Sequence, residues 1–245
     1  PGIVMQLYRE MDGRFEQVGV SWIKHGFFAL SNSQCTSCQN PSNGTFLGVG
    51  CSDTYGSSNN ADRFWLGPRD EWNAWRGSWT CLGSFFDGTP VDCQRDETGS
   101  GLNPVDHRLE AFDADLNNPG AKYFYEANYL VRNDEDLFNN SGSRECTMSW
   151  NGFSWQFSTP GGMSNPLKPG PALLERWGDV RTVAGLAPDD GNVVLSAKVE
   201  TLSPGVYRYE YALYNWNLDR KVESITFPVP FNSYDYYFHD TDDNA

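Results

Sequence analysis

Residues Val206–Tyr214, with the sequence VYRYEYALY, are the clearest indication of the fold class of this chain. Its large side chains occupy every second position and face one way, whereas Arg208 and Glu210 face the other way. The large side chains are those of Tyr207, Tyr209, Tyr211 and Leu213. A repeat of two is the repeat of a β-strand, because successive residues of a strand point to opposite faces of a sheet.

The segments on both sides of this stretch predict a meander of antiparallel strands. Asn192–Thr201 precedes it and is joined to it by the turn residues Ser203–Gly205. We expect a third strand at Val222–Val229, after the connection Asn215–Arg220. Consecutive strands joined by short turns are typical of an antiparallel sandwich or jelly roll.

The first two thirds of the chain also favour strands over helices. Ile3–Arg9 and Phe15–Trp22 flank the turn-forming residues Met11–Arg14 and predict a β-hairpin. Ala121–Val131 alternates tyrosines with polar residues and predicts a half-buried strand. Ala172–Trp177 is the one helical segment that we expect. The predicted fold class is therefore all-β, an antiparallel β-sandwich or jelly-roll-like fold with very little helix.

Size and composition indicate one β-rich domain that covers residues 1–245. Hydrophobic residues make up 39% of the 245 residues and aromatic residues 15%, which is enough for a substantial core. A loop-rich insert covers about residues 31–105. Ser, Asn, Gly and Cys dominate its first part, residues 31–60, and we expect disulfides to hold these loops. A net charge of −14 disfavours nucleic acids and favours cations such as Ca²⁺. The sequence has no apolar run long enough to span a membrane.

Six cysteines indicate an oxidising compartment and therefore a secreted or cell-surface protein. A redox or zinc role for the CxxC pair is disfavoured, because no helix follows the pair and no second pair of ligands completes a zinc site. Structural disulfides are the better interpretation. The cysteines are Cys35, Cys38, Cys51, Cys81, Cys93 and Cys146.

Spacing suggests how these cysteines pair. Cys81 and Cys93 are close enough in sequence to bridge one loop. We expect Cys51 to pair with one thiol of the CxxC pair at positions 35 and 38, and the other thiol of that pair to join Cys146. The full pairing stays open at the level of the sequence.

Several blocks of the sequence resemble a family of large, uncharacterised secreted proteins from environmental bacteria, planctomycetes among them. The blocks are Ser21–Leu30 (SWIKHGFFAL), Leu47–Asp53 (LGVGCSD), Leu66–Pro68, His107–Leu109, Asp113–Leu116, Tyr209–Asn215 (YEYALYN), Asp219–Arg220 and Phe238–Asp240. The resemblance covers most of the chain and implies secretion, but it implies no activity. The chain departs from the family at Trp72–Trp79, which is richer in tryptophan, and at Ala245, where members tend to continue with another β-rich segment.

Two acidic segments predict calcium sites. Asp113, Asp115 and Asn117 place hard oxygens at alternate positions of one loop, and Asp240 and Asp242 do so near the end of the chain. Ca²⁺ takes six to eight oxygen ligands, and a loop can supply several from a short stretch. Asp and Asn are also ordinary turn formers, so the alternative is a loop without metal. We place the first segment ahead of the second.

The three histidines predict a transition-metal site if the fold brings them together. They are His25, His107 and His239, and the last adjoins Asp240 and Asp242. Imidazole and carboxylate ligands suit zinc, iron or copper. The alternative is three separate histidines that are hydrogen-bonded or exposed. Calcium is the cofactor that we favour, ahead of a transition metal.

Four tryptophans, Trp65, Trp72, Trp75 and Trp79, suggest a platform on which sugar rings could stack. The spacing of the last three equally fits one face of a helical turn that packs on the core. Burial is the more common fate of tryptophan.

The sequence contains no evident catalytic machinery. It has no nucleophile elbow, and although a carboxylate pair such as Glu126 and Glu210 could be named, nothing singles it out. We therefore predict a secreted or cell-surface structural or binding protein of the extracellular matrix that self-associates through exposed aromatic residues and strand edges. The alternatives are a carbohydrate-binding module that contacts extracellular glycans through the Trp65–Trp79 cluster, and a secreted His/Asp metalloprotein, for instance an oxidoreductase.

Overall fold

A computed structural model describes residues 2–25, 29–34, 36–54, 56–60, 62–94, 96, 103, 106–161, 165–187, 190–228, 233–234 and 237. Its fold is all-β and sandwich-like, with antiparallel pairing in every strand pair of the described residues. Across this part of the chain, no helix is long and apolar enough to cross a membrane. The fold class predicted from the sequence is confirmed.

The larger sheet has nine strands within the described residues, and its main path runs β10-β9-β8-β1-β2-β7. β11 pairs with β9, β3 pairs with β1, and β4 pairs with β3. The strands are β1 (Gly2–Met11), β2 (Arg14–Val20), β3 (Ile23–His25), β4 (Leu66–Gly67), β7 (Glu110–Ala111), β8 (Lys122–Leu130), β9 (Ser141–Trp150), β10 (Trp155–Ser158) and β11 (Lys168–Pro169). β1 and β2 form the predicted hairpin, whose turn residues Asp12 and Gly13 both have positive φ.

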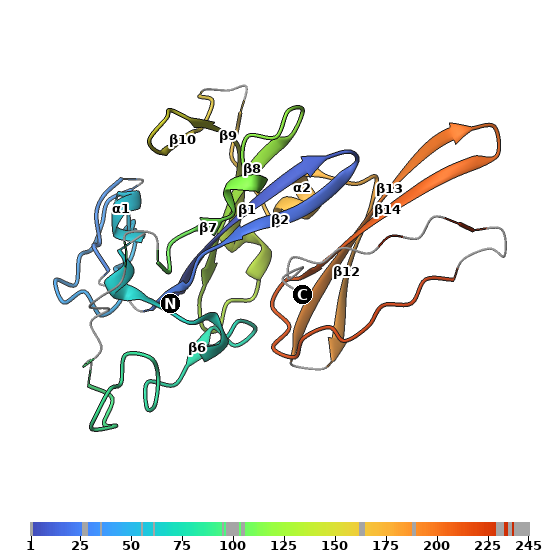
Figure 1. Cartoon of the computed structure of the whole chain (residues 1–245). Helices are drawn as coiled ribbons and strands as arrows, with labels where there is room; N and C mark the ends of the chain where they lie inside the picture. Colours follow the sequence, from blue (N-terminus) through green and yellow to red (C-terminus); the bar gives the residue numbers. More distant parts are fainter. Residues whose placement is uncertain are drawn as a thin grey trace.

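The smaller sheet has the order β12-β13-β14. Its strands are β12 (Val180–Ala187), β13 (Gly191–Ser203) and β14 (Val206–Asn215). The turn Pro204–Gly205 joins the last two, as the sequence predicts, and Gly205 has a φ of 79° that glycine adopts readily. Figure 1 shows the β13–β14 hairpin projecting beyond the body of the molecule. The strand predicted at Val222–Val229 is wrong over its described part, because residues 222–228 form no strand.

The main core lies between the two sheets. Tyr8, Phe15 and Phe124 of the larger sheet pack there with Val194 of β13 and with the short helix α2 (Ala172–Arg176). The indole Nε1 of Trp177, directly after α2, donates a hydrogen bond of 3.0 Å to the carbonyl of Gly13 in the β1–β2 turn. The helix that we expected at this place therefore forms, and it connects the two sheets.

The opposite face of the larger sheet carries a second cluster around Leu7, Tyr123 and Cys146. β8 consequently has both faces covered, with Tyr123 and Glu126 both buried. The expectation of a half-buried strand at this position is wrong, because the polar side of β8 faces the second sheet instead of solvent.

Between β3 and β8 the described chain forms only short elements and loops. Apart from β4 and β7 of the larger sheet, these are α1 (Ser57–Asn60), three-residue 3₁₀ turns, and the two-stranded sheet of β5 (Trp72–Asn73) and β6 (Ser78–Trp79). The 3₁₀ turns are η1 (Arg63–Trp65), η2 (Arg69–Glu71) and η3 (Asp113–Asp115); η4 (Leu137–Asn140) follows β8.

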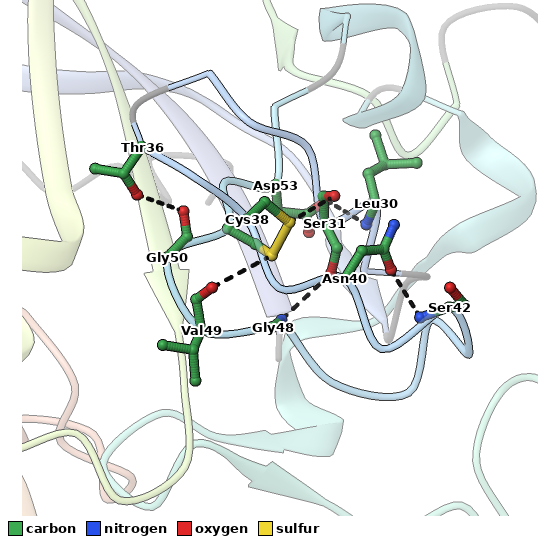
Figure 2. Close-up of a disulfide and its surroundings, with 11 residues drawn as sticks. Leu30, Ser31, Thr36, Cys38, Asn40, Ser42, Gly48, Val49, Gly50 and Asp53 are labelled. Atoms are coloured by element: carbon green, nitrogen blue, oxygen red, sulfur yellow. Dashed lines mark hydrogen bonds between the residues drawn. A yellow bond between two sulfur atoms is a disulfide. The ribbon is translucent and has the colours of Figure 1, made fainter.

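Two disulfides hold these loops. Cys38–Cys51 and Cys81–Cys93 are the pairs, with sequence separations of 13 and 12. The first pair is drawn in Figure 2, where the loop around it is also held by hydrogen bonds such as Thr36 Oγ1 to the Gly50 carbonyl at 2.6 Å. Crosslinks of this span stabilise mainly by restricting the unfolded chain.

The fate of the remaining cysteines corrects one prediction. Cys146 is a free thiol and is 2% exposed, so the expected disulfide to this residue is wrong. Cys146 belongs to β9. Its side chain lies in the cluster with Leu7 and Tyr123, away from the polar loops. Cys35 lies outside the described residues.

Candidate functional site

The predicted calcium loop is held by contacts to other side chains. Asp115 forms an ion pair with Arg9 at 3.0 Å, and Asp113 Oδ1 accepts a hydrogen bond of 2.7 Å from the Trp155 indole. Asn117 has a φ of 57° and follows the 3₁₀ turn η3. The two carboxylates are thus engaged by different partners. Calcium binding at this loop stays a prediction.

The three histidines are only partly described. His107 stacks on Trp22 with ring centroids 3.4 Å apart, and its backbone N–H donates a hydrogen bond of 2.6 Å to Glu110. Burial lowers the pKa of His107, although Asp106 and Glu110 oppose this shift. The backbone of His25 pairs with Gly2 in the larger sheet.

His239, Asp240 and Asp242 lie outside the described residues. The convergence of the histidines is therefore still a prediction. Within the described ranges, no group of three or more His, Cys, Asp or Glu residues is arranged to hold a metal ion.

The tryptophan cluster is a β-hairpin and not a helical turn, so that alternative is wrong. Trp72 and Trp79 are cross-strand neighbours of β5 and β6, and their rings stack with centroids 6.2 Å apart. Trp72 is buried against Val4 and Ile23. Trp75 is half-buried in the turn of this hairpin, whereas Trp65 is exposed at the end of η1. The four rings therefore do not form one flat platform.

An open cleft of about 500 Å³ lies beside this hairpin. Trp79 lines it together with Arg76 and Arg132 and with acidic and amide side chains. The acidic and amide side chains are those of Asp70, Glu71, Asn73 and Asp219. An indole beside charged and amide groups is a suitable lining for a polar ligand that also has an apolar face.

The outer face of the β13–β14 sheet is a second candidate surface. Tyr207, Tyr209 and Tyr211 are 53%, 55% and 45% exposed, and Leu213 and Val199 are exposed beside them. The rings of Tyr209 and Tyr211 stack with centroids 6.4 Å apart. We call this row of side chains on β14, from Tyr207 to Leu213, the tyrosine face.

One ring of this face, that of Tyr211, is in contact with a ring from outside the sheet. Phe227 stacks on Tyr211 with ring centroids 4.1 Å apart, and it belongs to the extended segment after β14. Figure 1 shows this segment running beside the smaller sheet. Large aromatic groups gathered on one exposed sheet face are typical of interaction sites.

The inner side of β14 faces the larger sheet and is polar near the hairpin tip. Arg208 is 3.2 Å from Glu200 and 4.0 Å from Glu210, and these side chains are partly exposed. Deeper in the molecule, Ala212 and Tyr214 pack on the main core. The alternation seen in the sequence thus separates an exposed aromatic row from a row that meets the other sheet.

A buried carboxylate occupies the centre of the interface between the sheets. Glu126 of β8 is 0% exposed. Its Oε1 accepts hydrogen bonds from Gln6 Nε2 at 3.2 Å and from the Tyr214 hydroxyl at 3.3 Å. Its Oε2 accepts from the backbone N–H of Ala172, the first residue of α2. Three parts of the fold therefore meet at one side chain.

The electrostatics of this carboxylate follow from its burial. Burial raises the pKa of Glu126 to about 7, while hydrogen bonds from Ala172, Asn128 and Tyr214 act in the opposite direction. Arg69 also lowers it, and burial lowers the pKa of Arg69 itself. The guanidinium of Arg69 donates hydrogen bonds to the backbone carbonyls of Ser21 and Met5. The Glu126 carboxylate therefore connects polar groups of several elements by hydrogen bonds.

Few of these features can be predicted from the sequence. The sequence predicts exposed aromatic residues, but it does not place them on β14. The one indication is that Arg208 and Glu210 alternate with the tyrosines. Glu126 carries no local motif, because its partners come from β1, β14 and α2. No family model, no curated protein and no solved structure matches this chain.

Proposed function

We propose that this chain is a structural and binding protein of the extracellular matrix or cell surface, and that it assembles through the tyrosine face. The observation that carries the proposal is the row of exposed tyrosines on β14, a strand at the edge of its sheet. Burial of aromatic side chains is a strong driving force for association, and tyrosine is enriched in interfaces. Secretion is supported by the two disulfides, which are typical of oxidising compartments.

Size measurement by light scattering over a concentration series tests this proposal. We expect the chain to associate with itself, and the triple change of Tyr207, Tyr209 and Tyr211 to Ser to shift it toward the monomer. The matched control changes Phe153 and Phe157 to Ser, because these aromatic side chains of the β9–β10 region are also exposed, at 92% and 54%. Association that responds to the control and not to the triple variant would contradict the proposal.

A second candidate function, glycan binding, is favoured by the cleft beside Trp79. An aromatic ring together with carboxylate, amide and guanidinium groups can contact both the apolar and the hydroxyl-bearing sides of a sugar. Titration of the chain with oligosaccharides, followed by tryptophan fluorescence, tests it. Arg76→Ala and Trp79→Ala should weaken binding, whereas Trp65→Ala, outside the lining of the cleft, should not. An unchanged affinity in Arg76→Ala and Trp79→Ala would exclude the cleft.

A further inference from the structure

The outer edge of β14 lacks a strand partner within the described residues. β14 is the last strand in the order β12-β13-β14, and among the described strands it pairs only with β13, from Val206 to Asn215. The segment that follows it forms no strand over residues 221–228. A long edge strand presents a row of backbone N–H and C=O groups that another strand can pair with.

We propose that a second copy of this chain pairs with this edge, antiparallel and about a two-fold axis at Tyr209. This inference rests on the proposed function and names its partner and its register. A closed dimer with two-fold symmetry is the most common form of homo-oligomer, and the same patch of both copies then forms the interface.

Symmetry restricts the register strongly. Directly opposite residues on antiparallel strands have side chains on the same face. Neighbouring residues of a strand point to opposite faces, so a residue cannot lie opposite the copy of its neighbour. A two-fold axis perpendicular to the sheet must therefore pass between a residue and the same residue of the second copy. With the axis at Tyr209, Tyr207 lies opposite Tyr211 of the second copy, and the tyrosine faces of both copies form one continuous surface.

The charges of Arg208 and Glu210 favour this register over the two registers in which the axis is moved by one residue. With the axis at Tyr209, Arg208 lies opposite Glu210 of the second copy, and the symmetry repeats this pair. Moving the axis to Arg208 places two arginines opposite each other, and moving it to Glu210 places two glutamates opposite each other. Opposite charges in directly opposed positions stabilise a strand pair and like charges destabilise it.

The side chain of Arg208 is available for a contact with the second copy. Arg208 has a side chain that is 50% exposed, and its contacts within the chain are the surface pairs with Glu200 at 3.2 Å and Glu210 at 4.0 Å. Exposed pairs of this kind contribute little to the stability of one chain. Arg208 can therefore contact Glu210 of the second copy without the loss of a buried interaction.

Single cysteines test the register directly. In the proposed dimer the Cα atoms of residue 209 in the two copies lie about 4.5–5.5 Å apart, a distance that a disulfide spans. The two copies of residue 207 are four positions apart along the strands, or roughly 13 Å. Tyr209→Cys should therefore form a covalent dimer under mild oxidation at a yield roughly tenfold above that of Tyr207→Cys. Both positions are equally exposed, so Tyr207→Cys is a matched control.

Charge reversal gives an independent test in the chain without added cysteine. Arg208→Glu and Glu210→Arg should each weaken dimerisation by roughly tenfold, because each creates two like-charge contacts. The double variant R208E/E210R should restore it. Circular dichroism and thermal unfolding verify that each variant is folded.

The outcomes separate this inference from the proposed function. Association that depends on the tyrosines but gives equal crosslinking at positions 207 and 209, or no rescue by the double variant, overturns the register and leaves the proposed function standing. A chain that is monomeric at every concentration overturns both.

Discussion

β8 and β14 have similar sequences and opposite environments. Both alternate tyrosines with polar residues, and both contain a Tyr-Glu pair, Tyr125–Glu126 in one and Tyr209–Glu210 in the other. β8 lies between β9 and β1 and is covered on both faces, whereas β14 is an edge strand with its tyrosines exposed. Alternation therefore indicates which side chains share a face, and the position of the strand in the sheet determines which face is covered.

The two glutamates show what this difference means energetically. Glu126 is fully buried and accepts hydrogen bonds from β1, β14 and α2, whereas Glu210 has a side chain that is 29% exposed and lies 4.0 Å from Arg208. A buried polar group is tolerated when its hydrogen bonds are satisfied. Four experiments test this difference between the two strands.

The largest difference is expected on removal of the two carboxylates. Glu126→Ala should lower the free energy of unfolding by about 3–5 kcal/mol, because Gln6, Tyr214 and Ala172 lose their shared acceptor and a cavity opens. Glu210→Ala, the matched control, should change it by about 0.5 kcal/mol or less. Urea unfolding at low protein concentration measures both. Similar losses in the two variants would show that the environments of the strands do not differ as described.

The dependence of stability on pH should report the burial of Glu126. The pKa of Glu126 is raised in the folded state from 4.5 to about 7, so the folded chain retains a proton that the unfolded chain releases. Stability should therefore fall as the pH rises from about 4.5 to 7, and this group should account for about 3 kcal/mol of the fall. The difference between wild type and Glu126→Gln, measured by urea unfolding at several pH values, isolates the effect. A difference that does not vary with pH would contradict it.

The other covered side of β8 can be tested at Cys146, its neighbour on β9 opposite Tyr123. Cys146→Ser places a hydroxyl in an apolar cluster and should cost about 1–3 kcal/mol. Cys146→Ala, the control without a polar group, should cost less than the serine variant. Thermal unfolding compares the two, and a serine variant as stable as wild type would mean that this face is accessible to water.

The smallest effect is expected for single tyrosine hydroxyls. The Tyr123 hydroxyl donates a hydrogen bond of 2.7 Å to the Asp115 carbonyl and accepts one of 3.0 Å from the Asn118 N–H. Tyr123→Phe should therefore lower stability by about 1 kcal/mol. Tyr209→Phe on the exposed face should leave the stability of the single chain unchanged. If chemical unfolding shows the reverse order, the assignment of covered and exposed faces is incorrect.

Sequence-based prediction succeeded where the signal was local. The β1–β2 and β13–β14 hairpins follow from alternation and turn residues, and the Cys81–Cys93 pair follows from its short separation. It failed where a distant partner decides the outcome. Residues 222–228 have strand-forming composition, but no neighbouring strand pairs with them in the described chain. The hairpin at Trp72–Trp79 is a separate case, because its partner is local but the spacing of its tryptophans also fits a helical turn.

The same limit applies to the candidate sites. The tyrosine face was predicted as a pattern, but its exposure depends on how the two sheets pack. Glu126 and the cleft beside Trp79 depend on residues that are far apart in sequence. No spacing rule could have brought these residues together, because the fold itself supplies the contacts.

The buried thiol on β9 has a consequence for oxidative refolding. Burial raises the pKa of Cys146 to about 12, so the sulfur stays protonated at physiological pH. Only thiolates attack disulfides, and once the central sheet has formed this sulfur can no longer enter exchange reactions. The loop crosslinks should then be able to break and re-form in redox buffers without scrambling through the interior of the protein.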